Sequence, residues 1–469
     1  MDTLQHAPAR ADVVVVGAGF AGLIAAREIA ATGRSVLVIE GRERIGGRAY
    51  CEQALGRRLE FGGGWVHWFQ PHVWAEMTRY GIAAVDAEQH PVDAAWMVDG
   101  AYRRASYDRM IEIAGRGMRG ITADSERVFP YPYSPLHEPA ATTDDARSVA
   151  EALDALGERI GLDGDERAVT HGLWQLDCHG PIGDVALTQV QRWTALAGHD
   201  WEQTSDASGR FVFAGGSGEL VSAIADESRA SLLLGAHVVA IRDNAPVVAI
   251  RDGAAPAATP DGAVGAAAGA AGADDEDAIT IELADGSRIA TGACIVTAPL
   301  NTLRGIEFSP ELPEQLREVA AIGQASRGSK CWFRVRGSAR PFMAIAPGDD
   351  AVNAIWWQYS TDDGFIGVAF AADGERHRPD DAAWVAGALA AYDPELELLE
   401  VAGHDWLADP FSRGTWAMLR PGQLARVQTA QQPFGRVIVA GADYATGWAG
   451  FFDGAIQEGY RAARHVIGR

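Results

Sequence analysis

The chain has 469 residues, of which 48% are hydrophobic and 22% charged, a balance typical of a folded protein with roughly two or three cooperating units. Its formal net charge of −23 opposes binding to nucleic-acid phosphates and to anionic membrane surfaces. Neither a targeting segment nor a membrane-spanning apolar run is present, and the four cysteines show no CxxC spacing, so we expect a soluble, cytoplasmic protein with reduced thiols and no metal site.

The first forty residues follow the pattern of a strand, a helix and a second strand. Residues 12–16 are an apolar β-branched run, residues 20–31 have helical periodicity, and residues 36–40 form the second run. Glycines in the turn between strand and helix permit the close approach of a pyrophosphate, and Glu40 can accept hydrogen bonds from a ribose. We therefore predict a Rossmann-like nucleotide-binding unit whose turn consists of Gly17, Gly19, Phe20, Ala21 and Gly22.

The run from Arg42 to Arg48 indicates which dinucleotide binds. NAD and FAD both suit a unit of this kind, but cations beside a Gly-Gly turn can neutralise a pyrophosphate through charge-assisted hydrogen bonds. We assign Arg42, Gly47 and Arg48 to the cofactor site and favour FAD.

The middle of the chain combines helical patterns with loops and then returns to the first unit. Residues 80–209 resemble a separate lobe, and the turn at 215–218 precedes a helix and a strand. Residues 253–277 consist almost wholly of Ala, Gly, Pro, Thr and acidic residues, which predicts a flexible surface loop or, in the Ala-rich part, a short helix. Val-Val-Ala-Ile-Arg-Asp occurs at 238–243 and again at 247–252, which paired strands, duplication or chance would explain.

The run from Glu40 to Arg48 resembles a signature of the flavin amine oxidases, the family of monoamine and polyamine oxidases. That family has Glu-x-Arg-x-Arg-x-Gly-Gly-Arg after its first βα unit, and this chain matches every specified position. Residues 61–66 resemble the next family block, whose backbone passes close to the flavin, and residues 441–455 resemble the final signature, where a helix begins under the isoalloxazine. The resemblance implies further FAD contacts from Gly62, Gly63, Gly64, Trp65, Val238, Trp406, Gly441, Asp443, Gly450 and Phe452.

The same resemblance implies which residues lie beside the reacting centre. Lys330 follows a strand and a Phe-Ser-Pro-Glu-Leu-Pro turn, the order in which the family presents the lysine that holds a water against flavin N5. The two aromatic rings of the family's substrate cage fall on Trp416 and Phe451, in place of the commoner tyrosines. Some members bind FAD covalently through a Cys, and this chain has Thr415 there, so we expect noncovalent FAD.

These patterns predict an α/β fold with two units. A Rossmann-like FAD-binding domain of the amine oxidase type would be built from the discontinuous segments 1–80, 208–300 and 421–469. A mixed α+β substrate-binding domain would comprise residues 81–207 and 301–420.

The block from Gly64 to Glu76 looks most like bacterial monoamine oxidases, including those acting on cyclic and nicotine-related amines, and we expect its His67 and Trp68 to line the cavity. We predict hydride transfer from a small hydrophobic primary or secondary amine to flavin N5, hydrolysis of the imine, and reduction of O2 to H2O2. A polyamine would favour acidic residues in the cavity, and the sequence places none there. An amine dehydrogenase with a protein electron acceptor, a desaturase-like or protoporphyrinogen-oxidase-like flavoenzyme, and a homodimer stay open.

Overall fold

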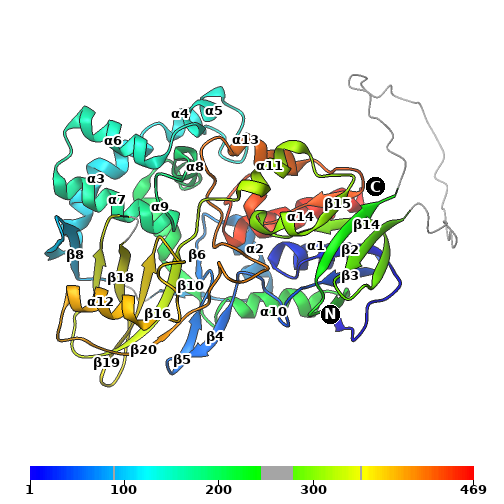
Figure 1. The fold of residues 1–469 in the computed structure, drawn as a ribbon, viewed down its shortest axis with the longest axis horizontal. Coiled ribbons are helices and arrows are strands. Elements are labelled where there is room, and N and C mark those ends of the chain that lie inside the picture. Colours follow the sequence, from blue (N-terminus) through cyan, green and yellow to red (C-terminus); the bar gives the residue numbers. More distant parts are fainter. Residues whose placement is uncertain (88–89, 245–277, 349–350, 469) are drawn as a thin grey trace.

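The computed structural model describes residues 1–87, 90–244, 278–348 and 351–468. Two large sheets organise this part of the chain, and helices pack against both (Figure 1). This arrangement confirms the predicted α/β fold class. The predicted loop at 253–277 and the second copy of the repeat at 247–252 lie outside the described residues.

The first sheet contains the predicted strand–helix–strand unit. Its described strands, in order, are β1 (Asp2–Thr3), β11 (Ser231–Leu233), β3 (Val36–Ile39), β2 (Arg10–Val16), β14 (Arg288–Val296), β13 (Ile279–Leu283), β12 (Val238–Asp243) and β15 (Glu307–Ser309), and β21 (Val437–Val439) also pairs with β14. The central strands β3, β2, β14 and β21 pair in parallel. A parallel sheet of this kind has both faces covered, which is why its strands are apolar runs.

Side chains of β2 alternate between two cores. Val13 and Val15 pack with α1 (Phe20–Ala30) and α14 (Phe452–Ile467), whereas Val14 and Val16 pack in the core on the other face. Because successive residues of a strand point to opposite faces, the uninterrupted valine run is what a doubly covered strand requires.

The second sheet carries the other half of the molecule. Its described strands, in order, are β20 (Glu397–Ala402), β16 (Ser329–Arg336), β19 (Gly364–Ala371), β18 (Val352–Ser360), β17 (Phe342–Ile345), β8 (Asp93–Val98) and β9 (Ala101–Ser106). On β16, Trp332 faces a core shared with α3 (Tyr107–Thr122), α6 (Val149–Ile160) and α7 (Gly164–Cys178), whereas Phe333 faces the core under α12 (Ala382–Tyr392). Lys330, two residues before Trp332, therefore belongs to the face covered by the helical lobe.

Helix α7 has well-defined ends. It begins with a capping box in which Asp163 and Glu166 each accept a hydrogen bond from the other's backbone N–H. It ends at His179, which adopts the left-handed conformation with φ 49°. This left-handed residue stops the helix directly after Asp177 and Cys178.

The remaining described elements are shorter or lie outside the two large sheets. They are β4 (Cys51–Ala54), β5 (Arg57–Glu60), β6 (Trp65–Val66), β7 (Ala84–Asp86), β10 (Phe211–Phe213), α2 (Pro71–Tyr80), α4 (Ser125–Val128), α5 (Pro139–Asp145), α8 (Leu187–Leu196), α9 (Trp201–Gly209), α10 (Ser217–Glu227), α11 (Glu314–Ile322), α13 (Leu424–Val427) and the 3-10 helices η2 (Leu300–Gly305), η3 (Gln428–Gln431) and η4 (Ala442–Tyr444). Strand β15 pairs with β12 in the first sheet. The division of the chain into two domains stays a prediction. Within the described ranges, no helix is both long enough and apolar enough to cross a bilayer.

A buried ion pair joins the first helix to α2. The Arg27 guanidinium donates to both carboxylate oxygens of Glu76 at 2.6 and 2.9 Å, and both side chains are almost fully buried. Tyr460 of α14 also contacts this pair. Burial lowers the pKa of Arg27, but the hydrogen bond and charge of Glu76 outweigh that effect and raise it.

Replacing Glu76 tests how much this pair holds the helices together. Glu76→Ala leaves the Arg27 cation buried without its main partner, so we expect a loss of about 3 kcal/mol in the free energy of unfolding, measured by urea denaturation. The control is Glu28→Ala, which removes a partly exposed partner of the same arginine and should cost under about 1 kcal/mol. Equal losses in the two variants would contradict the assignment.

Candidate active site

A single cavity of about 1040 Å³ runs from the first sheet to the second. Its walls come from the β2–α1 turn, the segments at 40–49 and 61–65, strand β16, helix α7 and the segments at 406–416 and 441–455. The cavity is therefore built from parts of the chain that are far apart in sequence. It lies at the upper end of the range for small-molecule sites, which indicates a large ligand or two ligands.

The glycines of the β2–α1 turn allow two stretches of backbone to approach closely. Gly17 has φ +103°, and a Cβ there would lie 2.4 Å from Oγ1 of Thr297. A Cβ on Gly22 would lie 1.9 Å from the carbonyl oxygen of Gly17, so Gly22 is required by packing inside the turn and does not itself line the cavity. Gly19 faces Gly47 across the cavity wall, and Gly46 N–H donates to the Ala18 carbonyl at 2.8 Å.

Glu40 is held firmly at the end of β3. Its Oε2 accepts from Ala18 N–H at 2.9 Å and its Oε1 accepts from Arg42 N–H at 3.0 Å. The side chain is 4% exposed and lines the cavity. The Arg42 guanidinium also donates to Oε1 at 3.4 Å, so Oε2 is the oxygen that keeps a further lone pair for a ligand.

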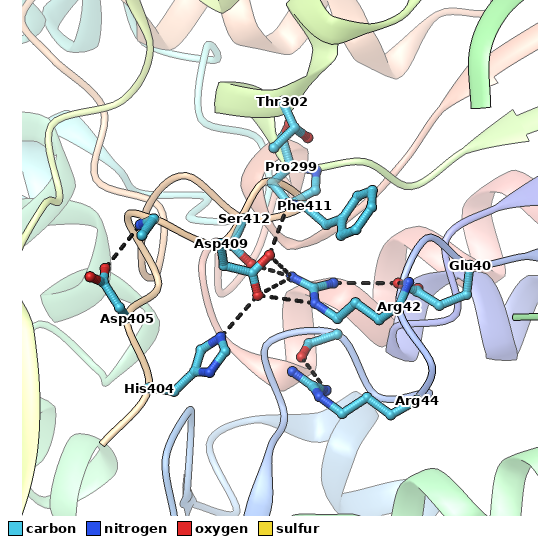
Figure 2. Close-up of polar contacts among 12 residues, drawn as sticks. Glu40, Arg42, Arg44, Pro299, Thr302, His404, Asp405, Asp409, Phe411 and Ser412 are labelled. Atoms are coloured by element: carbon cyan, nitrogen blue, oxygen red, sulfur yellow. Dashed lines mark hydrogen bonds and ion pairs between the residues drawn. The ribbon is translucent and has the colours of Figure 1, made fainter. Parts of the chain in front are cut away.

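Arg42 makes contacts other than those the sequence suggested. Figure 2 shows its guanidinium directed at Asp409, whose carboxylate it contacts at 2.9 and 3.1 Å, and it also donates to Ser412 at 2.7 Å. Burial opposes ionisation of Asp409, but the hydrogen bond with His404 and the Arg42 charge together hold the pKa of Asp409 at about 2. Arg42 thus lines the cavity while anchoring the 409–412 segment.

Arg48 and Asp443 likewise form an ion pair with each other. Arg48 also donates to the Thr415 carbonyl, and Asp443 accepts from Leu300 N–H at 2.9 Å. Arg48 lines the cavity, but Asp443 is buried behind it and does not. Asp443 therefore positions Arg48 and η2, and its contact with the cofactor stays a prediction.

A second glycine-rich wall faces the aromatic end of the cavity. A Cβ on Gly62 would lie 1.9 Å from the Arg48 carbonyl oxygen, and one on Gly63 would lie 2.8 Å from the Phe452 ring. Gly450 has φ +85°. These positions leave backbone exposed to the cavity and make a flat slot.

Lys330 reaches this wall from β16. Its Nζ donates to the Gly62 carbonyl at 3.1 Å and lies 4.8 Å from the centre of the Trp65 ring. The side chain is 5% exposed, and this burial lowers the pKa of Lys330 to about 8, although the nearby Glu60 charge opposes the shift. Lys330 is also the only lysine in the sequence. Burial can bring the pKa of a lysine near neutrality, whereas an arginine at this position would stay charged.

The two aromatic residues predicted to form the substrate cage, Trp416 and Phe451, come from different segments of the chain and both line this cavity. Trp416 stacks on His179 with ring centres 4.3 Å apart and planes 9° apart, and its Nε1 donates to the Asp177 carbonyl at 2.9 Å. Phe451 packs edge-on against Trp193 and Trp448. Both predicted cage rings are therefore fixed in place by other buried rings.

His179 was missed from the sequence. Its Nδ1 contacts Thr415 Oγ1 at 2.9 Å, and burial lowers its pKa to about 4, so the ring is neutral at neutral pH. The one available signal was its place directly after the helical pattern of α7, where a left-handed residue is expected.

Acidic residues also line the cavity, although the sequence alone placed none there. Within the described residues they are Glu40, Asp86, Asp177, Glu202 and Asp206. His67 and Trp68, in contrast, lie outside the lining: His67 is buried against Asp206 at 3.0 Å, and Trp68 is 46% exposed.

The other predicted site residues come together in this one cavity. Its lining includes Gly17, Gly19, Phe20, Ala21, Glu40, Arg42, Gly47, Arg48, Gly62, Gly63, Gly64, Trp65, Val238, Lys330, Trp406, Trp416, Gly441, Gly450, Phe451 and Phe452. Over the ranges that the structure covers, no cluster of three or more His, Cys, Asp or Glu side chains could hold a metal ion. A doubly covered parallel sheet with a glycine cradle at the end of its strands is the architecture of a dinucleotide-binding protein.

Comparisons with known proteins agree with this class. The chain matches the family of flavin-containing amine oxidoreductases over residues 20–467. It is 30% identical to pseudooxynicotine dehydrogenase of a Pseudomonas species, over 98% of this chain and 87% of that protein. It is 27% identical to (S)-6-hydroxynicotine oxidase of Paenarthrobacter nicotinovorans, over 97% of this chain and 99% of that protein. The fold also superposes on putrescine oxidase with a TM-score of 0.75, at 20% identity and full coverage of both chains.

The chain therefore belongs to the flavin-containing amine oxidoreductases. It is an enzyme whose cofactor is FAD, and the cavity fits that group. At Gly17, Gly62 and Gly63 a Cβ would clash with Thr297, Arg48 and Phe452, so only glycine lets the backbone run along the cavity wall there.

Replacing Gly19 tests the cradle without disturbing the fold. A Cβ at Gly19 meets only Gly47 at 3.9 Å, and its backbone φ of −77° suits alanine, so Gly19→Ala should fold. The added methyl would occupy space that the cofactor needs, and we expect the Kd for FAD to rise about 10- to 100-fold, measured by quenching of FAD fluorescence. Gly387→Ala, in open space on α12, is the control. Unchanged FAD affinity in Gly19→Ala would refute this placement.

The single lysine permits a direct measurement of its pKa. Protein labelled with 13Cε-lysine should give one lysine resonance in the NMR spectrum, and we expect it to titrate near pH 8 because burial disfavours the charged amine. A midpoint near 10.5, the value of an unperturbed lysine, would show that Lys330 is solvated instead.

Proposed function

We propose that this enzyme oxidises a small hydrophobic primary or secondary amine to an imine, which water hydrolyses to an aldehyde or ketone, with O2 reduced to H2O2. The observation that carries the proposal is that Trp416, Phe451 and Lys330 line one cavity, with Lys330 Nζ bonded to the Gly62 carbonyl of its glycine-rich wall. We propose that this wall holds the flavin end of FAD and that Gly17 to Ala21 and Glu40 hold its nucleotide end.

When bound, FAD supplies the two-electron acceptor that takes a hydride from the carbon beside the amine nitrogen. The chain's own residues bind and orient the amine. The rings of Trp416 and Phe451 confine it to a narrow apolar slot, and their fixed packing keeps the slot in shape. Tyr107, Ile111 and Leu173 extend the cavity wall and help to exclude water.

The amine of Lys330 can gain or lose a proton near neutral pH. Its amine donates to the Gly62 carbonyl, so it is held at the wall that faces the substrate slot. With a pKa of about 8, it is mostly protonated at neutral pH and can stabilise negative charge that develops nearby or give up a proton.

We further propose that FAD is bound noncovalently. None of the four cysteines, all of which lie in the described residues, lines the cavity, and Thr415 occupies the position of the family's attachment cysteine. A cytoplasmic location and a homodimer remain predictions from the sequence.

The electron acceptor has a second candidate. One relative is named a dehydrogenase and the other an oxidase, although both act on nicotine-related compounds by name. An amine dehydrogenase that passes electrons to a protein acceptor would use the same cavity residues.

A panel of amines tests both forms of the proposal. Purified yellow enzyme is mixed without oxygen with benzylamine, cyclohexylamine, nicotine and putrescine, and flavin absorbance is followed. We expect an apolar amine to bleach the flavin more than putrescine does, because aromatic and aliphatic side chains form most of the slot. Peroxide on exposure to air would identify an oxidase, and a flavin that stays reduced in air would identify a dehydrogenase. A flavin indifferent to all amines would favour the desaturase-like alternative.

A further inference from the structure

Asp177 stands at the end of α7, beside the aromatic cage. Its backbone carbonyl accepts a hydrogen bond from the Trp416 indole at 2.9 Å. Asp177 lines the same cavity as Trp416 and Phe451, and so do Leu173 and Leu176, which lie on the same face of the helix. Asp177 is therefore next in space to Trp416, one of the two rings that would enclose a substrate.

Among the described residues, no hydrogen-bond or ion-pair partner contacts the Asp177 carboxyl group. The other acids of this half of the cavity have partners: Asp206 contacts His67 and Arg210, and Glu202 lies 3.7 Å from Arg119. An unpaired carboxylate in an apolar environment is costly to a folded protein. Such groups are kept where a ligand supplies the missing partner.

The surroundings show what kind of partner is missing. Besides Glu202 and Asp206, the titratable groups that line this half of the cavity are Asp86, His90, Tyr107, His179, Arg210 and Lys330. Burial alone raises the pKa of Asp177 to about 7, and no neighbouring charge contributes to that shift. A cation brought next to Asp177 would therefore meet a group whose ionised form it stabilises.

We propose that Asp177 binds the positively charged nitrogen of the incoming amine and so selects amines over uncharged molecules of the same shape. This role rests on the proposed amine oxidation and adds to it the residue that recognises the substrate's charge. The Trp416 ring contributes through its negative face, which also attracts cations. This contact could not be expected from the sequence, because Asp177 occurs in a helix with no motif around it.

The test uses two ligands of one shape that cannot be oxidised as amines. Choline carries a trimethylammonium group, and 3,3-dimethylbutan-1-ol carries an uncharged tert-butyl group in its place. Isothermal titration of the FAD-bound enzyme should show choline binding at least about tenfold more tightly than the alcohol, because the charge meets Asp177 in a poorly solvated site. In Asp177→Asn this preference should disappear.

The matched control is Asp184→Asn. Asp184 lies after the same helix, pairs with Arg420 at the surface and does not line the cavity, so this variant should keep the preference. A preference that survives in Asp177→Asn, or a wild-type enzyme that does not prefer choline, would overturn the proposal. Reduction of the flavin by amines is measured separately, so failure of amine oxidation would be recognised independently of failure at Asp177.

Thermal stability distinguishes a binding role from a structural one. Because the folded pKa of Asp177 is raised, the contribution of Asp177 to wild-type stability falls as the pH rises from about 4 to about 7. Asp177→Asn carries no such charge, so its melting temperature should exceed that of the wild type above pH 7 and match it near pH 4. A lower melting temperature at pH 8 would assign Asp177 a structural role and overturn the proposal.

Discussion

The close approach of two stretches of backbone at Gly19 and Gly47 is the constraint on which the site depends. The β2–α1 turn and the turn at 46–47 come together there, joined by the hydrogen bond from Gly46 N–H to the Ala18 carbonyl. Larger side chains at these positions would close the space in which a dinucleotide lies. The rest of the cavity is assembled around this edge of the first sheet, and the second sheet delivers Lys330 to it.

Burial then sets the chemistry of the ionisable groups. The same physical cause lowers the pKa of Lys330 to about 8 and of His179 to about 4, and raises that of Asp177 to about 7. A poorly solvated site disfavours every charged form. The cavity thus holds a neutral imidazole beside the cage, together with an acid and an amine that can each exchange a proton near neutral pH.

Gly17, Gly19 and Gly47, which the sequence predicts from local turn motifs, all line the cavity. Their partners in space are distant in sequence, because Gly17 lies against Thr297 and Gly19 lies against Gly47. Predictions for charged side chains went less far. Arg42 pairs with Asp409 and Arg48 pairs with Asp443, and each pair joins residues hundreds of positions apart. The sequence therefore could not show which carboxylate each guanidinium would contact.

The sequence by itself determined the strand–helix–strand unit, the family and the order of the motif blocks, because apolar periodicity and glycine turns act over a few residues. The single lysine was also visible in the sequence. Only the tertiary structure decided that Asp443 stands behind Arg48, that His179 stacks on Trp416, and that Asp177 reaches the cavity without a partner. These contacts depend on how the two sheets and the helical lobe pack together, and long-range packing leaves no local pattern in the chain.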